Sequence, residues 1–277
     1  MPIFHAVVLG IVQGLSEFLP ISSSGHLLLA PWLFGWNDFD SESTEKAFDV
    51  ALHIGTVIAA IAYFRRDLVI YVRDGWRAVF DRQHRATTEG RVAWLLLLST
   101  VPAALVGAVF EDQIDEGLGT PTIIAISLIL GGLLLAVADR TTGKRQVDDY
   151  SVRDALVVGA AQALALNPGT SRSGITITAG RFIGFNRDSA ARISFLMMIP
   201  VTTGAVLLKG VGLAGDGIPE GLAVPMLVGI VTSAIAGWIA VWGTLKLVRT
   251  HSFMPFVVYR VALGVLVLIL VAVGYQD

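Results

Sequence analysis

Six long apolar segments limit what this chain can fold into. They lie at residues 46–64, 92–110, 121–138, 190–210, 222–245 and 253–274. A helix of about 20 apolar residues crosses the roughly 30 Å hydrocarbon core of a bilayer, and each segment is close to that length. Charged residues make up only 15% of the chain, whereas soluble domains carry about 25%. The sequence therefore predicts an all-α integral membrane protein with six transmembrane helices.

Two further apolar regions, 3–35 and 153–182, are each interrupted midway by proline, glycine and a cluster of hydroxyl residues. Non-helical backbone inside a membrane is tolerated only where protein or a water-filled cavity covers it. Each region is therefore predicted to form a re-entrant helical hairpin. The chain as a whole is expected to be one polytopic membrane domain, 1–277, without a soluble domain.

The loops sort by charge. Arginine and lysine concentrate in the loops 65–91, 139–153, 181–192 and 246–251, while the other loops are acidic. The positive-inside rule makes the basic set cytoplasmic, so both termini and the 36–46 loop are expected outside. The first hairpin then enters from outside and the second from inside. This predicts inverted repeats over approximately 3–66 and 153–212 whose polar tips meet within the membrane, a plan typical of transporters.

An internal duplication supports the same arrangement. A shift of 149 positions aligns residues 6–30 with 155–179 without a gap and gives nine identities in 25 positions. The shared polar and turn residues pair as Gln13 with Gln162, Ser22 with Ser171, Ser24 with Ser173, and Gly25 with Gly174. Only the first copy has Glu17, Ser23 and His26, whereas the second has Arg172 opposite Ser23. The copies thus look like complementary halves of one site.

Glu17 is an ionisable residue in an apolar stretch, where charge is costly and usually functional. Gln13 precedes it by four residues, on the same helical face. Oxygen ligands at this spacing suit a hard cation such as Mg²⁺ or Ca²⁺. The alternative is a structural ion pair between Glu17 and an arginine of the bundle.

Ser23 and His26 are spaced i, i+3 and would share a helical face. A serine needs an adjacent base to become a nucleophile, and histidine is the usual one. The alternative for any one of the serines 22–24 is a helix N-cap, because serine is a favoured capping residue.

The run Pro168-Gly169-Thr170-Ser171-Arg172-Ser173-Gly174 indicates a chain break followed by a new helix. Free N–H groups at a helix start bind phosphate, and an arginine fork matches phosphate in bidentate fashion. Ser171, Ser173 and Thr176 add hydroxyl donors. The alternative is an Arg172 that pairs with Glu17 or extends to the membrane surface.

Other features carry less chemistry. His53 lies on a predicted span, where a satisfied core histidine is the commoner case, and Arg260 is expected to pair or to snorkel to the membrane edge. The chain has no cysteine, P-loop, nucleotide fingerprint or zinc-type cluster, and its basic loops fit topology better than nucleic-acid binding. A cleaved signal peptide is not expected, because no basic region precedes the first apolar stretch.

The two motifs resemble the signatures of one family, the bacterial undecaprenyl-diphosphate phosphatases of the bacitracin-resistance type. The first signature is matched by Gln13-x-x-x-Glu17-Phe-Leu-Pro-Ile-Ser-Ser-Ser-Gly-His26, and the second by Pro168-Gly-Thr-Ser-Arg-Ser-Gly-Ile-Thr176. The run Phe253–Arg260 is similar to the family's last helix, so the resemblance spans the chain. The family accepts Glu or Gln at position 13, and Gln here leaves one carboxylate fewer for a metal.

The resemblance implies a multi-pass enzyme of the bacterial cytoplasmic membrane, with its active site open to the outer face. It would remove the terminal phosphate of undecaprenyl diphosphate with a divalent cation, Mg²⁺ or Ca²⁺, and regenerate the lipid carrier of cell-wall synthesis. Membrane lipids would surround it, and a homodimer is compatible with the sequence.

The mechanism expected on this basis has four parts. Arg172, Ser171, Ser173 and Thr176 hold phosphate oxygens, while Glu17 and Gln13 orient the metal. Ser23 attacks phosphorus and His26 takes its proton. Direct attack by His26 is the alternative within this class. A transporter or flippase of an anionic isoprenoid lipid is the alternative from another class, because the inverted repeat favours it.

Overall fold

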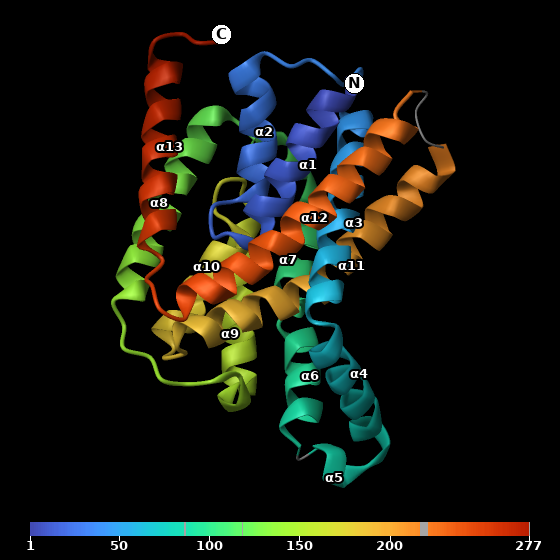
Figure 1. Ribbon diagram of the computed structural model, residues 1–277, viewed down its shortest axis with the longest axis vertical. Coiled ribbons are helices and arrows are strands. Elements are labelled where there is room, and N and C mark those ends of the chain that lie inside the picture. The colour runs from blue at the N-terminus through green and yellow to red at the C-terminus, as the bar shows by residue number, and fades with distance from the viewer. Residues whose placement is uncertain (86, 118, 217–220, 277) are drawn as a thin grey trace.

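A computed structural model describes residues 1–85, 87–117, 119–216 and 221–276, and the elements within these ranges are helices (Figure 1). Six of the described stretches are long and apolar enough to cross a membrane. They are α3 (Glu42–Tyr63), residues 88–110 of α6 (Thr88–Leu98) and α7 (Val101–Gly117), α8 (Pro121–Asp139), residues 187–210 of α11 (Arg187–Asp216), α12 (Ala223–Val248) and α13 (Met254–Ala272). The all-α class is thus confirmed for the described residues, and the six predicted spans are confirmed as helical stretches long and apolar enough to cross a membrane.

The two interrupted regions form pairs of short helices. The first pair is α1 (Ile3–Phe18) and α2 (Ser23–Phe34); the second is α9 (Val152–Ala163), extended by the 3-10 turn η2 (Leu164–Leu166), and α10 (Arg172–Phe182). At 1.5 Å per residue, each of these helices is only about 17–24 Å long, too short to cross the hydrocarbon core alone. Pro20 and Pro168 lie in the two breaks.

The second helix of each pair begins in the same unusual way. Its N-cap is a serine with positive φ, 80° at Ser22 and 74° at Ser171, a conformation that non-glycine residues seldom adopt. Each serine hydroxyl accepts a hydrogen bond from the glycine N–H three residues later, at Gly25 and Gly174. These positions are 149 residues apart, so the duplicated sequence folds into matching helix starts.

Small residues let α12 pack closely against α1, which carries Gln13 and Glu17, and against α3. A Cβ atom on Gly14 of α1 would lie 2.5 Å from the carbonyl oxygen of Ser233 and 2.7 Å from the nitrogen of Gly237, both on α12. Such close backbone approach is the common mode of helix packing in membranes. Ser233 also donates a hydrogen bond to the carbonyl oxygen of Leu52 on α3. As a result, α1 and α3 are fixed side by side against one helix.

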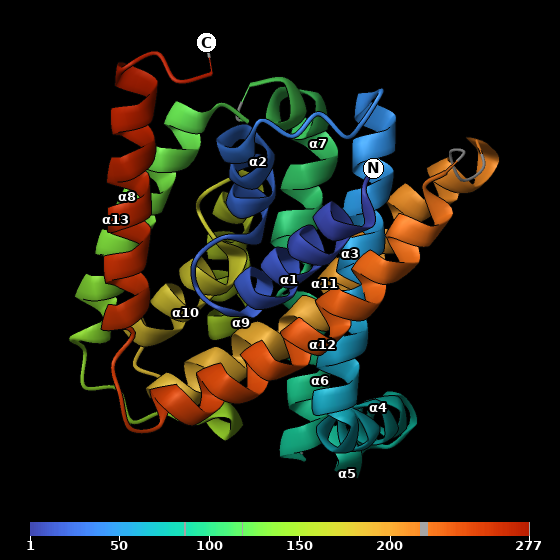
Figure 2. The same cartoon turned by 45° about the horizontal axis from the view of Figure 1, so that its top comes forward.

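The two ends of the molecule differ. Both chain termini lie at one end, and α4 (Arg65–Phe80) and α5 (Arg82–Arg85) lie at the other (Figures 1 and 2). The basic loop 65–91 contains α4, which exposes the aromatic side chains of Trp76 and Phe80. Trp94 of α6 donates a hydrogen bond to the Gly75 carbonyl and so ties α4 to the bundle.

Candidate active site

The two breaks meet each other inside the bundle. The backbone N–H of Gly169 donates a hydrogen bond of 3.1 Å to the hydroxyl of Ser22. In the other direction, the hydroxyl of Ser173 donates to the carbonyl oxygen of Leu19 at 3.0 Å. Each helix start is therefore connected to the unwound backbone of the other pair, which brings the two motifs into one site.

Arg260 of α13 holds both breaks in place. Its side chain is fully buried, and its guanidinium donates hydrogen bonds of 2.9–3.2 Å to the backbone carbonyl oxygens of Pro20, Ser127, Leu128, Gly169 and Thr170. Unwound backbone leaves carbonyl groups without helical partners, and buried polar groups need partners. The expectation that Arg260 would snorkel or form an ion pair is wrong, because its guanidinium is hydrogen-bonded to these buried carbonyl groups.

Glu17 is the centre of the polar network. One carboxylate oxygen accepts hydrogen bonds from the Ser23 hydroxyl at 2.5 Å and from the Gln13 amide at 3.2 Å. The other accepts from Arg172 at 3.0 Å. The carboxylate is 6% exposed, so these bonds form largely away from water. The pair of Glu17 and Arg172 that the alternative interpretation expected is present, yet it also engages Ser23.

Arg172 reaches across from the second helix pair. Besides the Glu17 side chain, it contacts the Glu17 carbonyl at 3.3 Å and the Ser194 carbonyl at 3.1 Å. Thr176 lies one turn further along α10, within 2.7 Å of the Arg172 carbonyl and 2.8 Å of the Ser194 hydroxyl. The guanidinium is therefore held in one orientation by α1 and α11.

A cavity of about 190 Å³ opens beside this network. It is lined by Ser16, Glu17, Ser22, Ser23, Ser24, His53, Ala165, Ser171, Arg172, Ser173, Val201, Thr202 and Ala205. Of the predicted site residues, Glu17, Ser23, Ser171, Arg172 and Ser173 line it. Gln13 and Thr176 stand behind it, in contact with Glu17 and Arg172.

His26 and Ser23 have separate partners. The Nδ1 atom of His26 lies 2.6 Å from the Ser22 carbonyl oxygen, and its Nε2 lies 2.7 Å from the Tyr259 hydroxyl of α13. A carbonyl only accepts, so Nδ1 carries the proton and Nε2 accepts from Tyr259. The Tyr259 ring is also stacked on the histidine. Both ring nitrogens are therefore engaged away from Ser23, whose hydroxyl is bonded to Glu17.

His53 is a site residue that the sequence interpretation missed. Its Nδ1 is bonded to the Asp49 carbonyl at 2.7 Å, and its Nε2 lies 3.9 Å from the Glu17 carboxylate. Nothing near His53 in the sequence distinguishes it from a core histidine. The signal that could have found it is its location on a span, where ionisable residues are costly and usually functional.

The donor set suits a weakly held hard cation. Among the residues that the structure describes, the Oε1 atom of Gln13 is buried without a hydrogen-bond partner, and it belongs to the same network as the Glu17 carboxylate. The described residues contain no cluster of three or more His, Cys, Asp or Glu that could hold a metal. Mg²⁺ is often held by one or two carboxylates together with substrate phosphates and water, so these residues fit such an ion.

Comparison with known proteins identifies the family. The model of the family "Bacitracin resistance protein BacA" matches residues 6–266. An undecaprenyl-diphosphatase of Geobacter sulfurreducens is 48% identical over 95% of this chain and 96% of the relative. One of Trichlorobacter lovleyi is 48% identical over 99% of both chains, and one of Hahella chejuensis 43% identical over 93% of this chain and 94% of the relative. The chain therefore belongs to the family of the bacitracin resistance protein BacA.

Proposed function

We propose that this protein is a membrane phosphatase that hydrolyses undecaprenyl diphosphate to undecaprenyl phosphate and phosphate, and so recycles the lipid carrier of cell-wall synthesis. The names of the relatives, which match over nearly their full length, support this activity. One observation carries the chemistry. Glu17 accepts hydrogen bonds from both Ser23 and Arg172. A nucleophile (Ser23), a base (Glu17) and a guanidinium that can bind an anion (Arg172) therefore line one cavity.

The diphosphate binds where α2 and α10 begin. The first residues of these helices, Ser23 and Arg172, line the cavity, and helix N-termini carry partial positive charge and free N–H groups. Arg172 is already oriented by Glu17 and by the Ser194 carbonyl, so little ordering remains when phosphate binds. Ser171 and Ser173 also line the cavity, and their hydroxyls become phosphate donors when they turn away from each other and from the Leu19 carbonyl. Thr176 acts through Arg172, because it lies behind that residue.

The reaction proceeds in two displacements. The Ser23 oxygen attacks the terminal phosphorus, its proton passes to the Glu17 carboxylate, and the bond from phosphorus to the bridging oxygen breaks. Undecaprenyl phosphate leaves. Water then attacks the phosphoserine and the bond from phosphorus to the serine oxygen breaks. The Glu17 carboxyl returns its proton to the Ser23 oxygen, and phosphate leaves with the oxygen of the water. The 2.5 Å hydrogen bond between Ser23 and Glu17 favours Glu17 over His26 as the base.

A divalent cation, Mg²⁺ or Ca²⁺, would be held by Glu17 and the Oε1 atom of Gln13 and would neutralise charge on the phosphates. The Nε2 atom of His53 lies 3.9 Å from the same Glu17 oxygen that accepts from Ser23 and Gln13, so His53 is a further polar neighbour of this oxygen. Charge neutralisation and positioning are the main needs of phosphoryl transfer.

His26 acts as a positioning residue in this scheme. Its bond to the Ser22 carbonyl fixes the first turn of α2, and its bond to Tyr259 ties that turn to α13. Direct attack by His26 has less support, because Nε2 faces Tyr259 and His26 is not among the residues that line the cavity.

For the topology, we propose that the six spans and the two broken helix pairs lie in the cytoplasmic membrane as inverted repeats over about 3–66 and 153–212. Both pairs are re-entrant, and the site opens to the outer face. The location of both termini opposite α4 and α5 supports this topology (Figure 1). Single cysteines at Ser43 and Thr87 test it with an impermeant thiol reagent on intact cells. We expect labelling at position 43 only; labelling at position 87 alone would reverse the topology.

One observation still favours the transporter alternative: the duplicated helix breaks. A transporter would need Arg172 to bind the anion, but it would not need the hydrogen bond between Ser23 and Glu17. Phosphate release from undecaprenyl diphosphate by purified protein in detergent separates the two. We expect release by the wild type and by Ser24→Ala, a neighbouring hydroxyl removed as a control, and at least about a hundredfold slower release by Ser23→Ala. Movement of lipid without any phosphate release would favour the transporter.

A further inference from the structure

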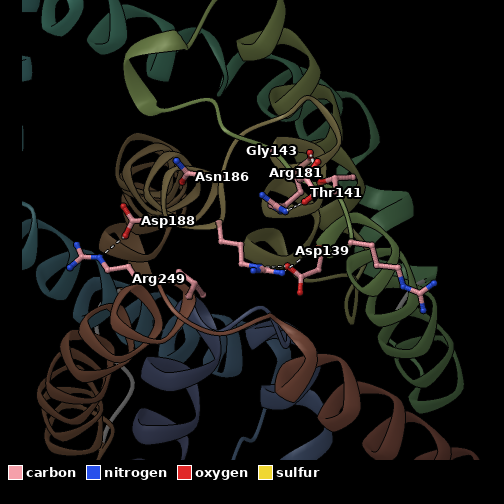
Figure 3. Close-up of a pocket in the computed structure, with 11 residues that line it drawn as sticks. Asp139, Thr141, Gly143, Arg181, Asn186, Asp188 and Arg249 are labelled. Atoms are coloured by element: carbon pink, nitrogen blue, oxygen red, sulfur yellow. Dashed lines mark hydrogen bonds and ion pairs between the residues drawn. The ribbon is translucent and has the colours of Figure 1, made fainter.

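A second polar pocket lies at the other end of α10, away from the Glu17 cavity (Figure 3). Its volume is about 590 Å³. It is lined by Asp139, Arg140, Thr141, Thr142, Gly143, Arg181, Asn186, Arg187, Asp188, Val248 and Arg249. These residues come from the ends of α8, α10 and α12, from the turn after α8, and from the start of α11. None of them has a part in the hydrolysis described above.

Positive charge dominates the lining. Four arginines face two aspartates, and both aspartates are already satisfied. Asp139 accepts hydrogen bonds from Arg187 and from the Phe253 N–H, and Asp188 accepts from Arg192 and Arg249. Within the described part of the chain, the side chain of Arg140 makes no hydrogen bond or ion pair. The pocket therefore keeps a net positive charge that its own carboxylates do not neutralise.

Arg181 points into the pocket from α10 with one donor unused. Its side chain is 3% exposed and donates to the carbonyl oxygens of Phe185 and Thr141. Its Nε atom is buried and, among the described residues, has no hydrogen-bond partner. Figure 3 shows the guanidinium extending toward the space between the turn after α8 and Asn186. The unpaired Nε atom itself is too buried for a ligand to reach, so Arg181 contributes chiefly a fixed positive charge in the wall of the pocket.

The backbone adds further donors around the same space. Asn186 caps α11 by accepting from the Ser189 N–H at 2.8 Å, which leaves the first N–H groups of that long helix at the pocket. The N–H groups of Thr142 and Gly143 make no hydrogen bond within the described residues. A Cβ atom on Gly143 would overlap the carbonyl oxygens of Gly184 and Phe185, so only glycine fits in this turn.

We propose that this pocket binds a phosphate group, as free orthophosphate or as the phosphomonoester headgroup of a membrane lipid. Arginine forks and free N–H groups at a helix start are the donors that phosphate oxygens prefer. The exposed apolar side chains of Val137 and Phe182 flank the lining residues on α8 and α10, where acyl chains would lie. Arg172 and Arg181 are nine residues apart on α10, so their Cα atoms are separated by about 14 Å along the helix axis.

The test compares two matched double variants. Arg140→Gln/Arg249→Gln removes two exposed pocket arginines and leaves Asp188 paired with Arg192. Arg66→Gln/Arg153→Gln removes two exposed arginines outside the pocket. Binding of radiolabelled orthophosphate is measured by equilibrium dialysis in detergent. Retention of phosphatidic acid is measured by native mass spectrometry after extraction from phosphatidylcholine nanodiscs containing it.

We expect the pocket variant to bind at least one of the two probes tenfold more weakly than the wild type, and the control variant to bind both normally. Loss of orthophosphate alone identifies the free anion, and loss of phosphatidic acid alone identifies a lipid. Unchanged binding of both probes by the pocket variant overturns the proposal, as does an equal loss in the control. If the pocket variant also lost undecaprenyl diphosphate hydrolysis, the weakened phosphate binding would belong to the Glu17 cavity, and the proposal of a second phosphate site would be overturned.

Discussion

The starts of α2 and α10 share a backbone and differ in chemistry. Both have a serine N-cap with positive φ bonded to a glycine N–H, at positions 149 residues apart. The residue after the cap is Ser23 in one and Arg172 in the other. Because the two starts contact each other, this single difference places a hydroxyl and a guanidinium on one carboxylate. The duplicated helix start thus supplies the geometry. The difference at one position makes Ser23 the proposed nucleophile of the first copy and Arg172 the proposed phosphate-binding residue of the second.

The strongest way to break this comparison is to remove the chemistry of the first copy. Ser23→Ala and Glu17→Gln should each lower kcat about 10²–10⁴-fold, the usual contribution of a positioned base. The double variant should be little worse than either single one, since residues that act as a unit are not additive. His26→Ala should lose less than Ser23→Ala. Phosphate release by folded protein measures all four, and an active Ser23→Ala beside an inactive His26→Ala would favour attack by histidine.

The second copy is tested by Arg172→Lys. Lysine keeps the charge but loses the planar fork that reaches Glu17, the Ser194 carbonyl and phosphate together. Loss of one such contact in the transition state should cost about 2–4 kcal/mol, which is roughly a hundredfold or more in kcat/KM. Arg153→Lys, on an exposed position of α9, serves as the control. Near-normal turnover of Arg172→Lys would remove bidentate phosphate recognition from the scheme.

What joins the two copies is Arg260, and Arg260→Lys should separate them. Lysine has three donors where the guanidinium has five, so some carbonyls of the two breaks lose their partners. Each buried carbonyl left alone costs about 1–3 kcal/mol. For a chain of this size we expect the thermal midpoint in detergent to fall by about 2–4 °C for each kcal/mol. A midpoint equal to that of the wild type would mean that the breaks do not depend on Arg260.

The sequence predicted the parts of this arrangement that depend on neighbouring residues. Spans follow from runs of apolar residues, and the breaks follow from Pro20, Pro168 and the hydroxyl clusters beside them. The motifs also predicted Glu17 and Arg172 as candidate site residues, because an ionisable side chain in an apolar stretch is costly and usually has a function. Each of these signals is local, so a single sequence is enough to read it.

Contacts between distant segments could not be predicted in this way. The spacing of Ser23 and His26 suggested a pair, but Tyr259, 233 residues later than His26, takes the second ring nitrogen. Arg260 looked like a residue near a membrane edge, and its carbonyl partners come from the unwound backbone of both breaks and from α8. His53 lies near Glu17 only because α3 packs beside α1, a contact between separate helices. In each case packing of separate helices decided the partner.

The smallest effects should come from the one pair of glutamines that the duplication shares. Gln13 donates to Glu17, but Leu166 stands where a second glutamate would be, and the Gln162 amide is buried without a partner among the described residues. An unsatisfied buried amide costs about 1–3 kcal/mol, so Gln162→Leu should leave stability unchanged or slightly higher. Gln13→Leu removes the Oε1 atom proposed to hold the cation and should raise the Mg²⁺ concentration for half-maximal activity at least about tenfold, the lower limit for loss of an outer-shell partner of a metal ligand. Metal titrations and thermal unfolding of both variants measure this. If the two substitutions shift the metal requirement equally, Gln13 has no special relation to the cation, and the copies differ less in function than Glu17 and Leu166 suggest.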